Sequence, residues 1–566
     1  MNSSVALPVL IPFATAIACL FVWNSTRLQR GITLLGTVGL LLSGLVLFQE
    51  VETYGVVSIQ MSGWSAPYGI TLVADRLGAI MVLLNGVVAL TGVLYAFGSI
   101  DKGREKFGFY PLLSAMFGGV SGAFLTGDVF NLYVWFEVVL MSSFVLLALG
   151  GERPQLEGAI KYVTLNLLSS TLFLVGIGVL YGFAGTLNFA DLAVKLAQTD
   201  RPELITVTAF IFLCAFGIKA AAFPFFFWLP ASYHTPPPVV SGVFAGVLTK
   251  VGVYAIFRMF SLVYTQEMWL THFIILWMGA ITMLTGVLGA AVQTDIRRIL
   301  AFHSISQIGY MLSGFGIAGV GISAAMAAGV EGQAERAAML TAGAGMALAG
   351  AIFFVLHHSL VKMNLFFVAG AVKKLRNAEE LEQVGGLYHA RPFLGAMFLI
   401  PALSLAGIPI LSGFWAKLAL VRAGLEVGTY AVVAISLVVS ILTLFSMTKI
   451  WANGFWAPPP DTPDGERGSD PGDEEDPPGY RLMLVPIVTL VVLMVAMSVL
   501  VGPAFRVVQK AADQLLADRV YIQQLWESSG KIERIDALLE ERNYVTTVLG
   551  EEYLRALLMP IEEEAP

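Results

Sequence analysis

The sequence predicts an all-α polytopic membrane protein with about fourteen transmembrane helices, and its composition and apolar runs carry this prediction. Hydrophobic residues make up 57% and charged residues 13% of the 566 residues, whereas a soluble domain carries about 25% charged residues. The mean hydropathy is +0.77. Apolar runs of about 20 residues, long enough to cross a bilayer as a helix, recur along most of the chain. These runs are centred near residues 13, 40, 87, 117, 139, 171, 216, 249, 280, 308, 355, 403, 439 and 491.

The first apolar run, residues 6–23, is expected to be a retained transmembrane helix. It has neither the basic segment nor the clear cleavage site of a signal peptide. The orientation follows from lysine and arginine: loops on one side of the membrane collect about 16 of these residues and loops on the other about 6. Because basic loops stay in the cytoplasm, we predict the N-terminus outside and the first loop inside. An even number of helices would also place the C-terminal tail outside.

The fifth run contains Glu137, nine residues beyond Asp128. At a rise of about 1.5 Å per residue, Glu137 lies about 13 Å into the helix, near the middle of the bilayer. An unpaired carboxylate at this depth would take up a proton or seek a cation. A structural ion pair that locks two helices is the alternative role for Glu137. For Asp128, capping of a helix N-terminus is a sufficient explanation.

The seventh run places Lys219 in an apolar stretch that continues into Pro224. A charge at this depth costs about 2.5–3.5 kcal/mol on insertion scales. Glu137 is the natural partner, because a buried lysine without a partner tends to lose its proton. Beside Glu137 the lysine would hold its proton, and it would release the proton when the carboxylate is drawn away.

The following helices carry further ionisable residues inside apolar runs. Lys250 lies well inside the eighth run and could receive the proton from Lys219, with snorkelling toward the membrane surface as the alternative. His303 and His358 are the best histidine candidates for proton relay, because the unperturbed pKa of histidine lies near neutrality. Lys362 follows His358 by four residues and therefore shares its helical face.

Three more histidines lie near the predicted route or its mouths, namely His234, His357 and His389. For any one histidine alone, a hydrogen-bonded structural role is the better interpretation. Together with lysines on consecutive helices, the histidines form a predicted chain of relay groups.

The twelfth run repeats the combination of proline and lysine, with Pro409 eight residues before Lys417 and Pro224 five residues after Lys219. Proline inside a span leaves backbone carbonyls unpaired, which is tolerated where a helix lines a polar cavity. A pair of broken helices in two related halves is typical of a transport site. Lys417 would end the relay chain on the second broken helix.

We expect one transmembrane domain over residues 1–503 and a tail over residues 504–566. Residues 457–480 are rich in proline, glycine and acidic residues, which predicts a disordered loop between the last two helices. The tail has apolar residues at helical spacing with charges between them. It is predicted to form one or two amphipathic helices on the membrane surface or docked on a neighbouring protein. A surface helix without a specific partner is an equally good interpretation.

Several classes of function are unsupported by the sequence. The two cysteines, Cys19 and Cys214, both lie in apolar runs, which argues against a disulfide framework and a cysteine-ligated cluster. The sequence has no P-loop motif and no strand-flanked dinucleotide fingerprint. We therefore expect no cofactor, no metal and no nucleic-acid partner, and energy from an ion gradient or a partner subunit. The net charge of −7 comes partly from acidic loop and tail segments and says little about partners.

Four stretches of the sequence resemble the antiporter-like subunits shared by respiratory complex I and the multisubunit Mrp-type cation/proton antiporters. They are PFFFWLPASYHTPPPVVSGVFAGVLTKVGVYAIFR (224–258), DIRRILAFHSISQIGYM (295–311), HHSLVKMNLFFVAGAV (357–372) and SLAGIPILSGFWAKLAL (404–420). The resemblance covers about residues 100–450 well and extends loosely to 500. Within that family, LTGDVFNLYVWFEVVLMSS and LPASYHTPPP are most similar to the D subunit of the Mrp-type Na⁺/H⁺ antiporters.

The resemblance implies fourteen helices in a prokaryotic cell membrane, two inverted five-helix repeats, and discontinuous helices seven and twelve. It also implies partners: one large homologous subunit, several small hydrophobic ones, and the ions H⁺ and Na⁺. The family's lysines and glutamate fall on this sequence at Glu137, Lys219, Lys250 and Lys417, and its central polar axis falls more loosely on His358 and Lys362. The implied activity is inward proton flow that drives Na⁺ out, with a role in pH homeostasis.

The same residues fit a second function, a proton-pumping membrane subunit of a redox complex such as NADH:quinone oxidoreductase or a membrane-bound hydrogenase. The subtype motifs and the chain length favour the Mrp-type antiporter. A structural scaffold with inactive ion pairs is disfavoured because the set of relay residues is complete. An independent enzyme is disfavoured because the sequence has no nucleophile–base constellation and no metal-ligand spacing. The segment 457–480 and the tail depart from a minimal D subunit, so the resemblance implies little about the last hundred residues.

Overall fold

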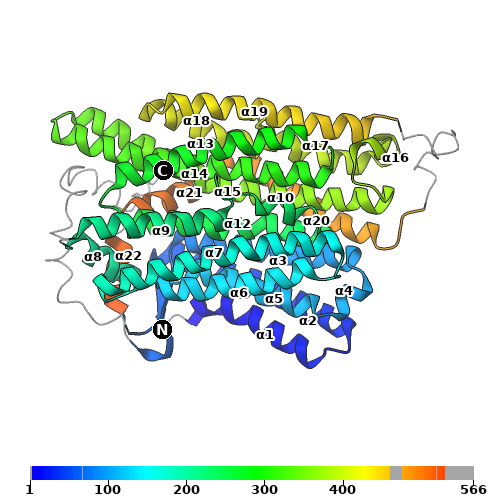
Figure 1. Ribbon diagram of the computed structural model, residues 1–566, viewed down its shortest axis with the longest axis horizontal. Coiled ribbons are helices and arrows are strands. Elements are labelled where there is room, and N and C mark those ends of the chain that lie inside the picture. The colour runs from blue at the N-terminus through cyan, green and yellow to red at the C-terminus, as the bar shows by residue number, and fades with distance from the viewer. Residues whose placement is uncertain are drawn as a thin grey trace, which may run out of the picture.

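The computed structural model describes residues 3–64, 66, 68–199, 201–458, 475–517 and 519–528. These residues form a bundle of nearly parallel helices (Figure 1). In this described part, 12 helices are long and apolar enough to cross a membrane, and Phe109–Leu125 and Pro392–Ala406 are shorter apolar helices. Each apolar run of the sequence corresponds to one of these helices. The predicted fold class, an all-α polytopic membrane protein, is therefore confirmed.

The first half of the chain contains most of the short connecting elements. Its elements are α1 (Leu7–Phe21), α2 (Thr26–Tyr54), β1 (Val57–Gln60), β2 (Thr71–Ala74), α3 (Arg76–Ser99), α4 (Lys102–Lys106), α5 (Phe109–Leu125), α6 (Val129–Ala148), α7 (Arg153–Ala184), α8 (Phe189–Ala197), α9 (Pro202–Ala220), α10 (Trp228–Tyr233), α11 (Pro238–Val243) and α12 (Thr249–Leu262). The two strands form an antiparallel hairpin in which Val57 lies opposite Ala74.

The second half contains the two longest helices, α14 and α15. Its elements are α13 (Met268–Val292), α14 (Ile296–Val330), α15 (Ala334–Arg376), α16 (Leu387–Ala390), α17 (Pro392–Ala406), α18 (Ser412–Val427), α19 (Tyr430–Ile450), α20 (Tyr480–Val499), α21 (Val501–Leu516) and α22 (Arg519–Ser528).

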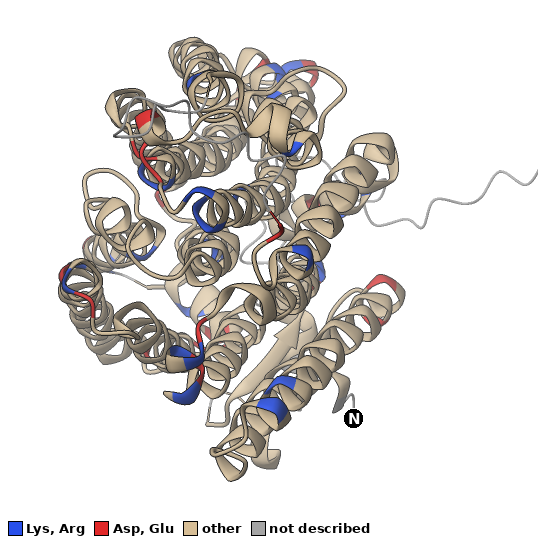
Figure 2. Ribbon diagram, turned by 90° about the vertical axis from the view of Figure 1, so that its right-hand side faces the viewer, with Lys and Arg blue, Asp and Glu red and all other residues tan. Residues whose placement is uncertain are grey.

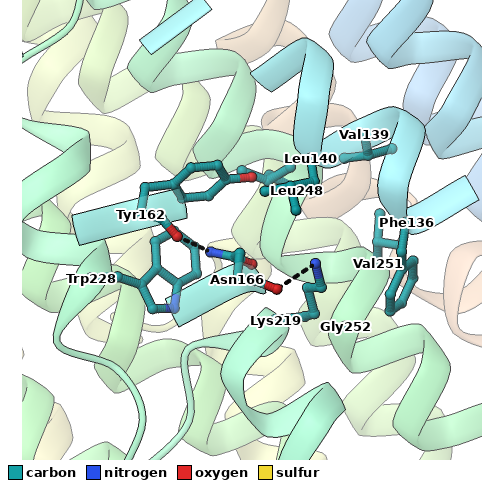
Figure 3. Close-up of a pocket in the computed structure, with 10 residues that line it drawn as sticks. All are labelled: Phe136, Val139, Leu140, Tyr162, Asn166, Lys219, Trp228, Leu248, Val251 and Gly252. Carbon is teal, nitrogen blue, oxygen red and sulfur yellow. Dashed lines mark hydrogen bonds between the residues drawn. The ribbon is translucent and has the colours of Figure 1, made fainter. Parts of the chain in front are cut away.

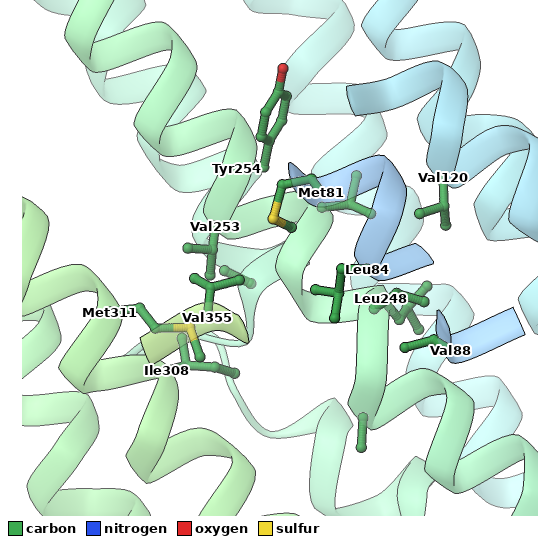
Figure 4. Packing of buried hydrophobic residues seen from close by; sticks show 14 of the residues in the cluster. Met81, Leu84, Val88, Val120, Leu248, Val253, Tyr254, Ile308, Met311 and Val355 are labelled. Carbon is green, nitrogen blue, oxygen red and sulfur yellow. The ribbon is translucent and has the colours of Figure 1, made fainter. Parts of the chain in front are cut away.

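The centre of the bundle is built around α12. A wider π-helical turn, Phe244–Leu248, joins α11 to α12, and the span Pro238–Leu262 is completely enclosed by other helices. Such a helix is mostly apolar on all sides, because no face of it meets lipid or water. Figure 4 shows the contacts: side chains of α3, α5, α14 and α15 surround Leu248, Val253 and Tyr254. Any ionisable group on α12 is therefore held inside protein.

Two spans are broken, as predicted from their prolines. The first break lies between α9 and α10: Ala221 takes a left-handed backbone conformation with φ 57°, and Pro224 follows within the break. The second lies between α17 and α18, where Gly407 has φ 89° and Pro409 follows. Gly407 ends α17 because only glycine adopts this conformation without steric cost, and its N–H satisfies carbonyls of the last turn.

The two ends of the bundle carry different elements. One end carries α4 and is called the α4 end; the other carries α22 and the N-terminus and is called the α22 end (Figure 1). Figure 2 looks onto the α4 end, where lysine and arginine residues gather in the loops. An even number of crossings places the N-terminus and α22 at the same end, in agreement with the predicted topology. The assignment of the α4 end to the cytoplasm stays a prediction.

The two helices after the last span dock on this chain's own α22 end. Gln514 of α21 accepts a hydrogen bond from the main-chain N–H of Arg76 at 2.9 Å and donates to the carbonyl of Gly55 at 3.0 Å. Tyr521 of α22 is buried, and the guanidinium of Arg258 lies 4.9 Å from its ring centroid. Docking on the same chain was not among the sequence interpretations of the tail. Residues 459–474 of the acidic loop and 529–566 of the tail lie outside the described residues.

Candidate functional site

Lys219 lies in the last turn of α9 and points at α7. Its ammonium donates to the carbonyl of Asn166 at 3.5 Å and to Ser170 Oγ at 3.3 Å, and it lies 5.6 Å from the ring centroid of Phe136. Glu137 acts on Lys219 electrostatically, but its buried Oε1 has no hydrogen-bond partner among the described residues. Glu137 and Lys219 are therefore neighbours, but they form no ion pair in the described part of the chain.

A small cavity of about 20 Å³ adjoins Lys219, which is room for about one water molecule. Figure 3 shows its lining, formed by Phe136, Val139, Leu140, Tyr162, Asn166, Lys219, Trp228, Leu248, Val251 and Gly252. The amide of Asn166 donates to the carbonyl of Tyr162 at 2.9 Å, and the Tyr162 hydroxyl lies 2.6 Å from Ser143 Oγ. A few polar groups therefore converge on an otherwise apolar cavity beside the lysine.

Lys250 is fully buried on α12, just past the wide π-helical turn. Its ammonium donates to the carbonyl of Ala245, within that turn. The next residues along the helix, Val251 and Gly252, line the cavity beside Lys219. Snorkelling is therefore excluded in this structure, because the side chain of Lys250 has no exposed surface.

Lys362 and two histidines continue the line on α14 and α15. Lys362 is fully buried and donates to the carbonyl of Leu300 at 2.9 Å. His358 has Lys250 and Lys362 as electrostatic neighbours, and His303 has Lys362 and Lys417. Both rings are fully buried, and none of their nitrogens has a hydrogen-bond partner in the described part of the chain.

Lys417 lies on α18 and bridges the second break. Its ammonium donates to the carbonyls of Leu405 and Ala406 at 3.0 and 3.2 Å and to Ser440 Oγ at 3.1 Å. These two carbonyls belong to the last turn of α17, where the helix dipole favours a cation. The ring of Tyr310 completes the site, with its centroid 4.7 Å from the ammonium.

The predicted relay residues form a line with two electrostatically linked parts. Electrostatic interactions join Glu137 to Lys219 and, separately, connect Lys250 to Lys417 through the histidines and Lys362, while helix packing alone connects the two parts. Its helices pack in sequence: α9 against α12, the π-helical turn before α12 against α15, and α15 against α18. The order of the line is Glu137, Lys219, Lys250, His358, Lys362, His303 and Lys417. Two predicted mouth residues stay outside it. His389 is exposed, and His234 contacts the carbonyl of Pro230 at 2.6 Å, at the end of α10.

Asp128 has the capping role predicted for it. Its Oδ1 accepts a hydrogen bond from the N–H of Asn131 at 2.8 Å, at the first turn of α6. Burial raises the pKa of Asp128 from an ordinary 3.8 to about 6. The carboxylate stands outside the line of lysines.

Sequence reasoning missed the uncharged polar residues around the lysines. Tyr162, Asn166 and Ser170 stand four residues apart on α7 and face Lys219. Polar residues at this spacing share one helical face, so the stripe was visible as a pattern. Tyr310 and Ser440, which hold Lys417, lie on two other helices, α14 and α19, and had no comparable signal.

The many spans, two of them broken, define a class of protein, the multi-pass helical membrane protein with discontinuous helices. A family model described as NADH:quinone oxidoreductase/Mrp antiporter, TM, matches residues 126–330 and 336–443. The D subunit of the Na(+)/H(+) antiporter of Alkalihalophilus pseudofirmus is 40% identical over 527 residues, which cover 93% of this chain and 99% of that protein. The corresponding D subunit of Bacillus subtilis is 39% identical over 464 residues, 82% of this chain and 89% of that protein.

Solved structures agree with these similarities. A chain of the Mrp complex from Dietzia sp. DQ12-45-1b superposes with a TM-score of 0.79 at 30% identity, covering 93% of this chain and all of that one. A chain of the archaeal membrane-bound sulfane sulfur reductase has a TM-score of 0.78 at 22% identity, which shows a shared fold alone. The chain belongs to the family of D subunits of the Mrp-type Na⁺/H⁺ antiporters, within the wider NADH:quinone oxidoreductase/Mrp antiporter family.

Proposed function

We propose that this chain is the proton-translocating subunit of a multisubunit Na⁺/H⁺ antiporter, and that protons move along the line from Glu137 to Lys417. Inward proton flow through the line would drive Na⁺ efflux by the assembled complex. The partners would be one large homologous subunit and several small hydrophobic ones in a prokaryotic cell membrane, with the N-terminus outside.

The observation that carries the proposal is the way in which the buried lysines are held. Lys250 and Lys362 are fully buried, and each donates to one main-chain carbonyl. No carboxylate pairs with either ammonium in the described part of the chain. An isolated buried charge is costly, whereas a structural lysine is usually neutralised by an acid. A lysine held in this way can take up a proton and then release it to the next group of the line.

Glu137 has a separate role in this proposal. It is the carboxylate at one end of the line, and it is half-buried on α6. Approach of its charge to Lys219 would stabilise the ammonium, and withdrawal would release the proton. The described conformation, in which Lys219 donates to oxygens of α7, corresponds to the separated arrangement.

Transport by the reconstituted complex tests the proposal. Complexes with Lys250→Ala or Lys362→Ala would be purified, checked for subunit composition, and placed in vesicles that report Na⁺-driven proton movement. We expect each change to lower the exchange rate by about 100-fold or more, the usual loss when a positioned proton-transfer group is removed. Exchange at the wild-type rate by either variant would refute the proposal.

Lys161→Ala is the matched control. Lys161 is exposed on α7 and pairs with Glu157 in an i,i+4 ion pair at 2.6 Å. Exposed pairs of this kind contribute about 0–1 kcal/mol. The control variant should assemble and exchange as the unchanged complex does.

The composition of the native complex separates antiport from redox-driven pumping. The antiporter relatives at 40% and 39% identity favour the antiporter. Gentle purification through this chain followed by mass spectrometry should yield several small hydrophobic subunits and one large homologous subunit. Copurification of flavin, iron–sulfur or nickel proteins would instead assign the line of lysines to a redox-driven proton pump.

A further inference from the structure

A buried cluster of one histidine and two hydroxyls holds the break in the second broken span. Ser404 lies in the last turn of α17, Ser412 is the first residue of α18, and His357 lies in the middle of α15. His357 Nδ1 lies 2.9 Å from Ser412 Oγ, which lies 3.2 Å from Ser404 Oγ. The N–H of Gly413 donates to Ser404 Oγ at 3.2 Å. The cluster thus connects both sides of the break to α15.

Close packing fixes this cluster. A Cβ atom on Gly413 would lie 1.9 Å from the carbonyl oxygen of Ser404 and 2.8 Å from Nε2 of His357. Only glycine at this position lets the ring approach the break. His357, Ser404 and Ser412 are all buried, so hydroxyl and ring partners within the cluster replace water.

Lys417 also hydrogen-bonds to the last turn of α17, the turn that contains Ser404. The carbonyls of Leu405 and Ala406, which accept from Lys417, directly follow Ser404. Lys417 and His357 also act on each other electrostatically, and His358 is the other titratable neighbour of His357. A shift of the α17 end would therefore change the contacts of Lys417.

Among the residues that the structure describes, no titratable side chain takes the corresponding place at the first break. There the N–H of Phe223 donates to Thr282 Oγ at 2.9 Å, and Trp228 Nε1 donates to the carbonyl of Ile218 at 2.9 Å. A threonine and a tryptophan keep the same charge at every physiological pH. The described residues around the two breaks therefore differ in whether a titratable side chain holds the break.

We propose that His357 is a protonatable latch on the second break and a positioning residue for Lys417, acting through Ser412 and Ser404. The inference rests on the proposed proton pathway. When the ring is neutral at Nδ1, the Ser412 hydroxyl donates to it. When the ring is protonated, Nδ1–H donates to Ser412 Oγ, the hydroxyl turns away, and the imidazolium repels the ammonium of Lys417. The charge of His357 would thus lower the affinity of Lys417 for its proton, an added pH response at the second break.

The pH profile of exchange tests the latch. His357→Asn keeps a side chain that can bond Ser412 but cannot titrate, and Ser412→Ala cuts the connection while keeping the histidine. We expect both assembled complexes to retain exchange, with the pH of half-maximal rate shifted by about one unit or the profile flattened. Should one variant fail to assemble, the other carries the same test.

Ser359→Ala is the matched control. Ser359 is a fully buried serine on the same helix, and its hydroxyl donates to the carbonyl of Val355 within that helix at 2.8 Å. Its pH profile should match that of the unchanged complex. The latch is refuted if His357→Asn and Ser412→Ala alter the yield of complex but leave the profile per complex unchanged.

The same series distinguishes the latch from the proton pathway itself. Loss of exchange in Lys250→Ala together with an unchanged profile in the two latch variants would refute the latch alone. Exchange that survives in Lys250→Ala would refute the pathway. A shifted profile in the latch variants would then assign His357 to a pH response outside that pathway, so the latch as proposed would fail too.

Discussion

Lys219 is held by oxygens of α7 and an aromatic face, while Glu137 stands apart with a buried, unpaired Oε1. Glu137→Ala should abolish exchange, because Lys219 loses the charge that controls its proton. Glu137→Gln should do the same, since an amide of equal size carries no charge. Exchange in vesicles checks both variants, and we expect a loss of about 100-fold or more.

Glu157→Gln is the control for this pair of variants, because Glu157 is an exposed carboxylate on α7 bound to Lys161. If the Glu137 variants lower the amount of assembled complex but leave the rate per complex intact, Glu137 is structural. That result would favour the ion-pair alternative, and the coupling of Glu137 to proton transfer would be wrong.

Asp128 gives a prediction for stability. Because burial raises its pKa to about 6, the folded chain binds a proton more tightly than the unfolded chain. The stabilising effect is complete below the ordinary pKa of 3.8 and is lost as pH rises through about 6. Asp128→Asn should remove this pH dependence, because the amide still caps α6. The melting temperatures of the unchanged complex and of the Asp128→Asn complex, measured between these pH values, check the prediction. The assignment is contradicted if the melting temperature of the variant depends on pH as steeply as that of the unchanged complex.

At the scale of single residues, the sequence showed the charged groups well and the uncharged ones poorly. Lys250 and Lys362 were visible because a charge in an apolar run is costly and therefore rare. Tyr310 and Ser440 were not, because a neutral polar residue costs little in an apolar helix and needs no special partner. Their role depends on which helix lies opposite, and tertiary packing alone decides that.

At the scale of elements, the distance between α9 and α12 sets the separation of Lys219 and Lys250. A Cβ atom on Gly252 would lie 2.5 Å from the N of Ala220 and 2.8 Å from the carbonyl carbon of Lys219. Gly252→Ala should push the helices apart and cost about 1–3 kcal/mol, as overpacking does. We expect a lower melting temperature of the complex and slower exchange.

Gly178→Ala is the control for Gly252→Ala. Gly178 lies on α7, and a Cβ atom at this position would meet nothing within 4 Å. Alanine also favours a helix over glycine by about 1 kcal/mol, so this variant should be as stable as the unchanged chain or more so. A Gly252→Ala complex that melts and exchanges like the Gly178→Ala complex would show that the close approach of α9 and α12 is unimportant.

The breaks illustrate how far a pattern predicts an element. Pro224 and Pro409 indicated both interruptions, because proline cannot continue the hydrogen-bond ladder of a helix. The wide turn before α12 carries no proline, so its sequence did not predict that one of its carbonyls would accept a hydrogen bond from Lys250. The contact of His357 with Ser412 joins residues 55 apart in sequence and required the folded structure.

At the scale of the whole molecule, the line of lysines crosses the centre of the bundle. The helices α21 and α22 pack on the α22 end of the bundle (Figure 1). Below these two helices Arg258 forms a buried ion pair with Asp75 at 2.7 Å. Arg258 lies on α12, two turns from Lys250 along the same helix. The tail helices therefore pack over the end of the element that carries the central lysine.

Removal of the tail after residue 503 tests this arrangement. The truncated chain would lose the hydrogen bonds of Gln514 to Arg76 and Gly55 and the ring of Tyr521 over Arg258. Exposure of a formerly buried ion pair to water weakens it, so the complex should melt at a lower temperature and be recovered in smaller amount. A chain that ends after residue 528 keeps every one of these contacts and is the matched control. If both truncated chains yield equally stable complex, the docked helices contribute nothing to the bundle, and only a reduced yield confined to the shorter chain would support their role as its cover.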